Sequence, residues 1–372
     1  MEKQKRILFL IDHLNFGGAQ THLIDLVNNL GKEFRPEILL LSEKTELVSR
    51  IHPSIEIHKE TRRWRFDFSL TNRIASYIVK GNYDSYMAAS SFAFFFLSSA
   101  RKKLGLNFPI HLILHSSQIL SFTDFLRRFL FIRYKKPQDK FISTCRFQVE
   151  YFSKTFRIPS NQFQTIYNGI DTNRFTLAPS SFNPAAFKTS LGIPAAAKVV
   201  LQVATLRKEK AHQYSIEALG ILNKAENEKA YLLIVGGGNE LLQEQLRQVS
   251  EKAGVSPYVK FCGMQEDLRP YYWISDLFTL SSIAIETFSI SALIAMASGI
   301  PCVLTDVGGA REMVTDTMNG FVVPPKDPKA LAEGWRKVLG GAVSLRPEQI
   351  RKIVEEKFSL DSMVRSYEAL IQ

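Results

Sequence analysis

The chain has 372 residues, 45% of them hydrophobic and 22% charged, which suits two domains of a soluble globular protein. No apolar run reaches the roughly 18 residues that a membrane span needs, and MEKQKRILFLID at the start has no secretory pattern. The three cysteines lack metal-ligand spacing, so we expect a reduced, cytoplasmic setting.

The net charge of +11 belongs entirely to the first half of the chain. Residues 1–176 hold 26 Lys and Arg against 15 Asp and Glu, whereas residues 177–372 hold 21 of each kind. Such a field favours an anionic partner for the first half: a membrane surface, a phosphate-bearing acceptor or nucleic acid. A solvated face with no specific partner is the alternative. Because no nucleic-acid-binding motif is present, we expect no nucleic acid partner.

The first half alternates short apolar runs with helical patterns. Buried strands are predicted at 6–12, 36–42, 110–116 and 139–144. Apolar residues between Leu23 and Leu30 fall on one helical face and predict a helix that ends at Gly31. This alternation favours a doubly wound parallel sheet.

A stretch rich in Pro, Ser and Ala, residues 176–194, breaks the rhythm and is predicted to be a connector. A second α/β series follows, with strands predicted at 198–206, 231–238, 258–263, 276–282 and 301–306. A helix is predicted at the end, over 361–372. We therefore expect two doubly wound α/β domains with a cleft between them, because such sheets bind ligands at the carboxyl ends of their strands.

Several predicted loops at strand ends carry residues suited to a phosphate or a sugar. Gly17 and Gly18 open a helix, where free N–H groups and the helix dipole suit a phosphate, although a tight turn explains them equally. Arg207 and Lys210 could clamp a diphosphate, and a solvated charged loop is the alternative. His115 ends an apolar strand, where a histidine is well placed for a site. A structural histidine is the alternative.

Glu286 lies between a predicted strand and a helix that starts near Ser289. Its carboxylate could accept hydrogen bonds from sugar hydroxyls while the helix N-terminus holds phosphate, and a helix-capping acid is the alternative. The three glycines at 236–238 do not form the dinucleotide pattern, so they predict a tight turn or a donor contact and no nicotinamide cofactor. No Walker A, HExxH, GxSxG or Cys/His cluster occurs, and we expect neither cofactor nor metal.

Four longer stretches carry a family resemblance: GGAQ (17–20), IYNGIDTNRF (166–175), VATLRKEKAHQYSIEAL (203–219) and ETFSISALIAMASGIPCVLTDVGGAREMV (286–314). Together, over nearly the whole chain and in the right order, they resemble the family 4 retaining glycosyltransferases of the GT-B fold. The resemblance implies an acceptor-binding Rossmann-like domain over 1–176 and a nucleotide-sugar-binding one over 177–356. It also implies that the final helix, 357–372, packs back on the first domain.

The resemblance further implies roles for single residues. Arg207 and Lys210 are expected to stabilise the leaving diphosphate, Glu286 to hold donor-sugar hydroxyls, and His115 to lie near the reacting sugar. The donor-binding positions that it implies are Gly17, Gly18, Gly236, Met264, Phe288, Ser289, Ile290 and Ile294. Among these, the backbone amides of Phe288 and Ser289 are expected to meet the phosphates. Such enzymes usually need no metal.

Three features depart from the pattern of most members. Thr205 stands where many have an arginine, and Thr287 and Ser289 replace glycines, but another subset of the family shares both features. Ile294 replaces a second glutamate that binds ribose hydroxyls, and it is also an apolar residue suited to packing. Losing charge-assisted hydrogen bonds of about 1.5–3 kcal/mol is expected to weaken donor binding roughly ten- to a hundred-fold.

We therefore expect a retaining, metal-independent hexosyltransferase that moves a sugar from a nucleotide-diphosphate sugar to a glycan or lipid-linked acceptor in bacterial surface polysaccharide synthesis. The alternative is a non-catalytic GT-B protein that binds a glycan or a partner enzyme. Residues 121–136 and 62–68 interleave Arg and Lys with bulky apolar residues. This pattern favours peripheral contact with an anionic membrane at the inner face of the cell membrane, although an ordinary packed helix explains 121–136 nearly as well.

Overall fold

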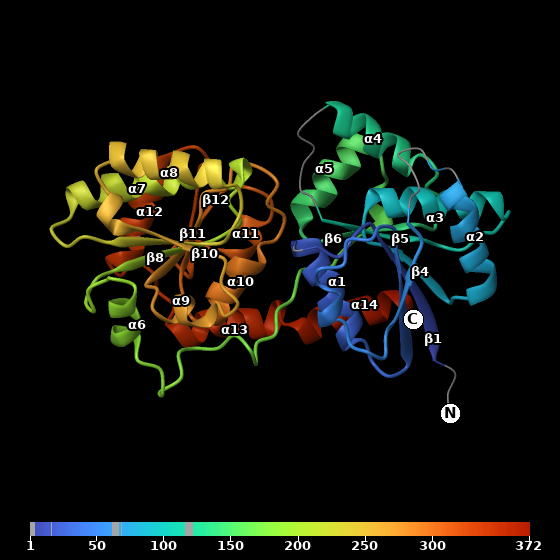
Figure 1. Ribbon diagram of the computed structural model, residues 1–372, viewed down its shortest axis with the longest axis horizontal. Coiled ribbons are helices and arrows are strands. Elements are labelled where there is room, and N and C mark those ends of the chain that lie inside the picture. The colour runs from blue at the N-terminus through green and yellow to red at the C-terminus, as the bar shows by residue number, and fades with distance from the viewer. Residues whose placement is uncertain (1–3, 16, 62–66, 68, 116–121) are drawn as a thin grey trace. The chain divides into compact units, whose positions relative to one another are not determined.

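Two parallel sheets, one in each part of the chain, form the framework of the computed structural model (Figure 1). The structure describes residues 4–15, 17–61, 67, 69–115 and 122–372. Unit 1 comprises Met1–Asn168 and Leu360–Gln372, and unit 2 comprises Gly169–Ser359. The chain thus leaves unit 1 eight residues before the boundary predicted at 176, and it returns for its last helix.

The sheet of unit 1 has seven parallel strands in the order β3-β2-β1-β4-β5-β6-β7. Their bounds are β1 (Lys5–Ile11), β2 (Phe34–Leu40), β3 (Glu56–Lys59), β4 (Ser85–Ala88), β5 (His111–Leu114), β6 (Lys140–Ser143) and β7 (Phe163–Thr165). The four strands predicted from apolar runs are present. The other three were not predicted, because β3 and β7 are edge strands of mixed polarity and β4, SYMA, begins with a polar residue.

The helices of unit 1 cover both faces of this sheet (Figure 1). They are α1 (Gly18–Asn29), α2 (Ser69–Gly81), α3 (Ser91–Lys103), α4 (Phe122–Ile132), α5 (Arg146–Phe156) and α14 (Leu360–Ile371). Successive residues of β1 point to opposite faces. Phe9 joins a cluster with residues of α1 and α14, whereas Leu8 joins one with residues of α2, α3 and α5. The last helix therefore completes the core of unit 1, although it is separated from α1 by most of the chain.

The sheet of unit 2 has six parallel strands in the order β10-β9-β8-β11-β12-β13. Its strands are β8 (Val199–Val203), β9 (Tyr231–Val235), β10 (Val259–Gly263), β11 (Leu277–Leu280), β12 (Cys302–Thr305) and β13 (Gly320–Val323). Its helices are α6 (Pro184–Ser190), α7 (His212–Ala225), α8 (Glu240–Lys252), α9 (Arg269–Trp273), α10 (Ile290–Ala297), α11 (Ala310–Met313), α12 (Pro328–Leu339) and α13 (Pro347–Lys357). One face of the sheet packs against α7, α8 and α12, with Trp335 fully buried in that cluster.

The predicted connector at 176–194 is not a plain linker, because it contains α6. The side chain of Asn183 accepts a hydrogen bond from the amide of Ala186, and Pro184 occupies the first helical turn. An Asn-Pro pair is a good helix start, since the Pro needs no N–H partner there. The Pro and Ser content of this stretch concealed that signal.

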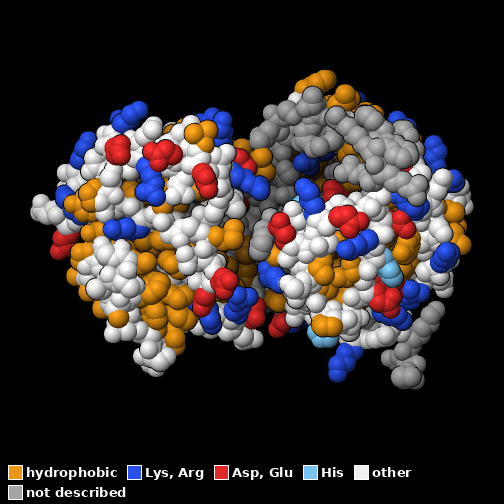
Figure 2. Space-filling view, viewed as in Figure 1, with side chains coloured by type: hydrophobic (Ala, Val, Ile, Leu, Met, Phe, Trp, Pro, Cys, Tyr) orange, Lys and Arg blue, Asp and Glu red, His pale blue; other side chains and the backbone are white. Residues whose placement is uncertain are grey.

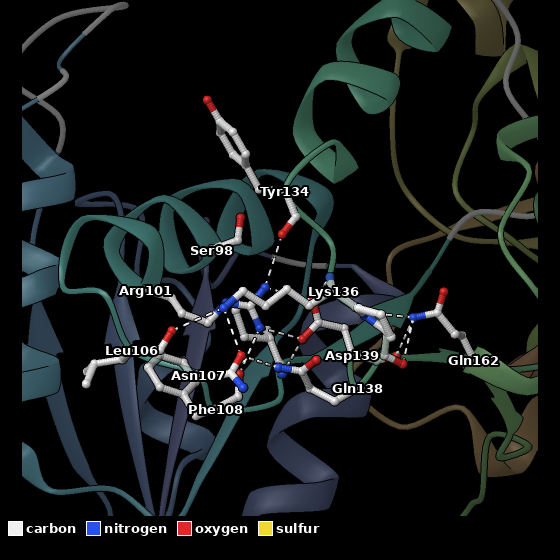
Figure 3. A network of polar contacts seen from close by, with 12 residues as sticks. Ser98, Arg101, Leu106, Asn107, Phe108, Tyr134, Lys136, Gln138, Asp139 and Gln162 are labelled. Atoms are coloured by element: carbon white, nitrogen blue, oxygen red, sulfur yellow. Dashed lines mark hydrogen bonds and ion pairs between the residues drawn. The ribbon is translucent and has the colours of Figure 1, made fainter.

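A buried ion pair fixes two loops of unit 1 (Figure 3). The side chains of Arg101 and Asp139 are 1% and 0% exposed, and Nη1 of the arginine lies 2.6 Å from Oδ1 of the aspartate. Backbone groups use much of the remaining capacity of the pair: the carbonyls of Phe108 and Tyr134, and the amides of Ile110 and Lys136. This pair therefore holds together the segment just before β5 and the segment between α4 and β6. Within the described residues, no helix is long and apolar enough to cross a bilayer.

Candidate functional site

The carboxyl end of β11 organises the polar centre of unit 2. Ser281 and Ser282, which follow the strand directly, are almost fully buried. The Oγ of Ser281 lies 3.1 Å from the carbonyl oxygen of Lys210, and the amide of Ile283 donates to the carbonyl of Glu209 over 2.9 Å. The strand end therefore holds the basic loop that follows the neighbouring strand, β8, as expected where parallel strands end at one edge.

An ion pair at this edge joins the two charged residues that the sequence had singled out. Nζ of Lys210 lies 2.6 Å from Oε2 of Glu286, and the hydroxyl of Ser282 donates to the same oxygen over 3.0 Å. The Lys and Glu side chains are 21% and 17% exposed. Among the described residues nothing bonds Oε1 of Glu286, so this oxygen can accept a hydrogen bond from a ligand hydroxyl.

Arg207 lies at the start of the same basic loop. Its backbone precedes a short 3-10 turn, η3 (Lys208–Lys210), and its side chain is exposed. Within the described parts of the chain, the guanidinium makes no hydrogen bond or ion pair. All its donors are thus available to an anion, whereas Lys210 is already paired with Glu286.

The backbone around Glu286 is strained and tightly packed. Ile285 has a φ of 56°, which is costly for a β-branched residue, of order 1–3 kcal/mol. A Cβ at Gly308 would lie 1.9 Å from the carbonyl oxygen of Glu286, and the amide of Gly309 donates to the carbonyl of Thr287 over 2.7 Å. Strain of this kind persists where the surroundings enforce it, and it is common at functional sites.

The helix that follows, α10, begins beside this strained turn. Ser289 caps it by accepting a hydrogen bond from the amide of Ala292, and its first turn holds no acidic residue. Its positive N-terminal end therefore lacks a side-chain countercharge within the helix. Phe288 is 1% exposed and packs on Phe358, so only its backbone could meet a ligand. A cavity of about 10 Å³, enough for one water, lies beside Glu286 and Ser289.

Two further predicted positions of α10 are apolar. Ile290 is partly buried and Ile294, one turn later, is 6% exposed. Ile294 therefore packs as an ordinary helix residue of the core. Its side chain offers no hydrogen bond at the position where the family resemblance implies a ribose ligand.

Gly236 and Met264 follow the strands β9 and β10. A Cβ at Gly236, whose φ is 145°, would lie 2.2 Å from the carbonyl oxygen of Ala204, so this glycine permits a close backbone approach. Met264 is 66% exposed and its side chain lies over Gly237. The tight-turn explanation therefore suffices for Gly236, while Met264 presents an exposed apolar surface.

The remaining predicted positions belong to unit 1. Gly17 precedes α1 with an extended backbone that any residue can adopt, and a Cβ at Gly18 would meet nothing within 4 Å. His115 follows β5, and its buried Nε2 has no hydrogen-bond partner in the part of the chain that the structure describes. Its ring centroid lies 5.3 Å from that of His22, whose Nε2 lies 3.0 Å from the hydroxyl of Tyr367.

Burial keeps both of these histidines neutral near pH 7. It lowers the pKa of His22 to about 4, an effect that the side chain of Asn168 opposes only in part. Burial, and secondarily the neighbouring His22, lower the pKa of His115 to about 3. His115 therefore carries no charge at neutral pH.

Within the described residues, one group of side chains has the composition of a metal site. Ligand atoms of Glu37, Glu56 and His58 in unit 1 lie within 4.8 Å of one another, in a groove of about 460 Å³. Glu37 is already paired with Arg6 at 2.6 Å and accepts from Tyr83 at 2.8 Å. Burial alone would raise the pKa of Glu37, but these two partners hold it below its usual range. The group is therefore a self-neutralised ion network, which fits a metal poorly.

Sequence reasoning missed the serines that hold the site. Ser281, Ser282 and Thr305 lie at the ends of β11 and β12, and the Thr305 hydroxyl donates to the carbonyl of Ser282 over 2.6 Å. A short polar run directly after an apolar strand is the signal that could have indicated them. His22 and Tyr367 carry no such signal, because each lies within a helical pattern.

Comparison with known structures identifies the class of fold. The chain superposes on the crystal structure of Anabaena Alr3699/HepE in complex with UDP, with a TM-score of 0.84 and 21% identity, over 98% of this chain and 99% of that one. It superposes on WaaG, a glycosyltransferase involved in lipopolysaccharide biosynthesis, with a TM-score of 0.75 and 18% identity, over 98% and 99%. The two sheets are those of the GT-B glycosyltransferases.

Comparison of sequences gives the family. Residues 16–174 match the model described as Glycosyltransferase Family 4, and residues 185–355 match that of Glycosyl transferases group 1. The chain therefore belongs to the group 1 glycosyltransferases of family 4.

Curated relatives match part of the chain. One is an uncharacterized glycosyltransferase of Methanocaldococcus jannaschii, 32% identical over 56% of this chain and 54% of that protein. Another is N-acetyl-alpha-D-glucosaminyl L-malate synthase of Bacillus anthracis, 28% identical over 57% and 54%. The chain spans about half the length of these curated relatives.

Proposed function

We propose that this glycosyltransferase moves a sugar, with retention and without a metal, from a nucleotide-diphosphate sugar to a glycan or lipid-linked acceptor of a bacterial surface polysaccharide. The observation that carries the proposal is the Lys210–Glu286 pair at the strand ends of unit 2. Arg207, three residues before Lys210, has no ion-pair partner among the described residues. Similar folds have been solved with UDP and with UDP-glucose, which supports a nucleotide-sugar donor.

The proposed roles follow from the chemistry of these groups. The acceptor oxygen forms a bond to the anomeric carbon, and the diphosphate oxygen leaves with the electrons of the bond that breaks. Lys210 and Arg207 stabilise the negative charge that the diphosphate gains. Glu286 accepts hydrogen bonds from sugar hydroxyls through its available oxygen, and the N-terminal end of α10 faces a phosphate. His115, which burial keeps neutral, is the residue proposed to lie near the reacting sugar.

The first experiment removes each charge of the pair. Lys210→Ala and Glu286→Ala are each expected to lower turnover of a nucleotide sugar about 10²- to 10³-fold, as the loss of one preorganised charge stabiliser does elsewhere. Lys198→Ala is the matched control, because it removes an ion pair to Asp276 in the same unit, 3.1 Å long and partly exposed. Unchanged turnover in both site variants would show that the site is wrongly assigned.

The donor itself can be found by thermal shift. A panel of nucleoside diphosphates and their sugars is added to the purified chain, and a ligand that favours the native state raises the melting temperature. The pair variants Lys210→Ala and Glu286→Ala should reduce that shift. Absence of a shift with every donor tested would favour the alternative function.

The alternative is a non-catalytic protein of the same fold that binds a glycan or a partner enzyme. Ile294 favours it, because this buried residue offers the donor no polar contact. Ile294→Glu is expected to raise donor affinity about ten-fold or more if the pocket is in use, with Ile294→Leu as the packing control. No binding by the wild type or by either variant would support the non-catalytic function.

An anionic membrane is the partner that we propose for unit 1. Four large apolar side chains of α4 are exposed, namely Phe122 (76%), Leu126 (46%), Phe129 (50%) and Leu130 (41%). Figure 2 shows hydrophobic side chains at the surface in the region of α4, and the exposed Arg133 follows the helix. Exposed apolar and basic groups together suit an anionic bilayer. The other predicted segment, 62–68, lies outside the described residues apart from Asp67.

Vesicle sedimentation tests this surface. The chain should sediment with vesicles rich in anionic lipid at low salt, and Phe122→Ser with Phe129→Ser should reduce the bound fraction. Val79→Ser is the matched control, because Val79 is 64% exposed on α2 of the same unit. Failure of the wild type to sediment would remove the membrane proposal and leave the proposed reaction intact.

A further inference from the structure

Contacts between three side chains, Tyr367, His22 and His115, connect the last helix to the end of β5. The hydroxyl of Tyr367, on α14, lies 3.0 Å from Nε2 of His22, on α1. The ring of His22 meets Tyr367 at 63° with centroids 5.6 Å apart, and it meets His115 at 70° with centroids 5.3 Å apart. His22 therefore lies edge-on between the C-terminal helix and the end of β5.

Packing alone does not require these polar atoms. Tyr367 is 0% exposed and His22 is 3% exposed, and both lie in the apolar core between α1, α14 and the sheet. Phenylalanine or leucine would fill this space without a desolvation cost. A buried hydroxyl that meets a buried imidazole instead helps to fix the orientation of the His22 ring, together with the side chain of Asn168, because Nε2 loses this partner when the ring turns away.

The contact with His22 contributes to the orientation of His115. Within the described residues the buried Nε2 of His115 has no hydrogen-bond partner, so no bond from that nitrogen holds the ring. The edge-to-face contact with His22 is the aromatic contact of His115 in the described structure. A rotation of His22 would remove that contact and leave the His115 ring less constrained.

We propose that Tyr367 and His22 are positioning residues for His115, so that the C-terminal helix completes the sugar-facing part of unit 1. The inference rests on the proposed function, in which His115 lies near the reacting sugar. The helix α14, which packs in the core of unit 1, would then also contribute to the reaction. Tyr367 acts through two rings and does not touch the substrate itself.

A double-mutant cycle tests this order of action. Tyr367→Phe keeps the ring and removes the hydroxyl, and it is expected to lower kcat for sugar transfer, or for hydrolysis of the donor without acceptor, about 2- to 10-fold. The donor KM should change little, because Lys210, Glu286 and α10, which are proposed to hold most of the donor, belong to unit 2. In a His115→Ala background, Tyr367→Phe should have no further effect on kcat.

The control is Ser366→Ala, on the same helix, whose hydroxyl donates only to the carbonyl of Ser362. It should leave kcat unchanged in both backgrounds. Equal losses from Tyr367→Phe in the presence and absence of His115 would overturn the proposal, and so would no loss at all. If His115→Ala is fully active while Lys210→Ala and Glu286→Ala are not, the positioning role fails and the proposed function stands.

A spectroscopic measurement separates positioning from folding. With ¹⁵N-labelled histidine, the ring signals of His22 and His115 should both shift in Tyr367→Phe and remain in place in Ser366→Ala. Signals of His115 that do not move when the tyrosine hydroxyl is removed would contradict the proposal, even if activity had changed. The measurement needs no donor or acceptor, so it holds whatever the substrate proves to be.

Discussion

Two ion pairs with the same shortest N···O distance, 2.6 Å, differ in their exposure to solvent and in their remaining hydrogen-bonding capacity. Arg101–Asp139 in unit 1 is 1% and 0% exposed, and backbone groups use much of its remaining hydrogen-bonding capacity. Lys210–Glu286 in unit 2 is 21% and 17% exposed, and one carboxylate oxygen has no partner in the described structure. The difference shows that distance alone does not identify a site. Spare hydrogen-bonding capacity and access to solvent do.

The largest predicted effect is that of removing a charge from the buried pair. Asp139→Asn leaves Arg101 charged, buried and unpaired, which is expected to cost about 3–5 kcal/mol of unfolding free energy. Urea unfolding measures the loss. Asp267→Asn, at an exposed pair with Arg269, is the control and should leave the unfolding midpoint nearly unchanged. A loss for Asp139→Asn as small as that of the control would mean that the buried pair is not structural.

The same kind of change at the site should affect activity rather than stability. Glu286→Gln keeps the shape of the side chain and removes its charge, and we expect turnover to fall about 10²-fold or more. Unfolding free energy should change by less than about 1 kcal/mol, because water reaches both partners. If Glu286→Gln instead loses much stability and keeps its turnover, the Lys210–Glu286 pair is structural and not part of the site.

A smaller effect is expected from the serine that orients Glu286. Ser282→Ala removes the hydroxyl that donates to Oε2 over 3.0 Å, and donor affinity should fall roughly 2- to 10-fold. The control is Ser275→Ala, whose hydroxyl donates to the carbonyl of Tyr271 in α9. Titration with the donor found by thermal shift measures both variants. Equal affinity in the two variants would show that Lys210 alone holds the carboxylate.

The smallest predicted effect concerns pH. Burial, and secondarily Lys210, lower the pKa of His212 from 6.5 to about 4. Between pH 6.5 and 4 the unfolded chain therefore binds the extra proton, so stability falls as pH falls. From pH 7 to pH 6 the loss is about 0.7 kcal/mol for one such histidine. His212→Leu should remove that share of the pH dependence, measured by urea unfolding at both values. If His212→Leu leaves the pH dependence of the unfolding free energy unchanged, the lowered pKa of His212 is contradicted.

Much of the central framework could be predicted from the sequence, because apolar runs report their own burial. The runs at 6–12 and 198–206 became β1 and β8, and Lys210 and Glu286 could be placed at strand ends from those runs. The edge strand β3 could not, since edge residues need not be apolar on both faces. The helix α6 was hidden by its composition.

The two α/β series, the charge bias of the first half and the residues available at the strand ends can all be read from the sequence. Which charges have their hydrogen-bonding capacity filled, and which serine bonds Glu286, follows from the packing of the folded chain. That packing alone brought Tyr367 to His22, across 345 residues of chain. The physical reason is that periodicity reports how deeply a side chain is buried. The identity of its partner depends on how distant segments pack.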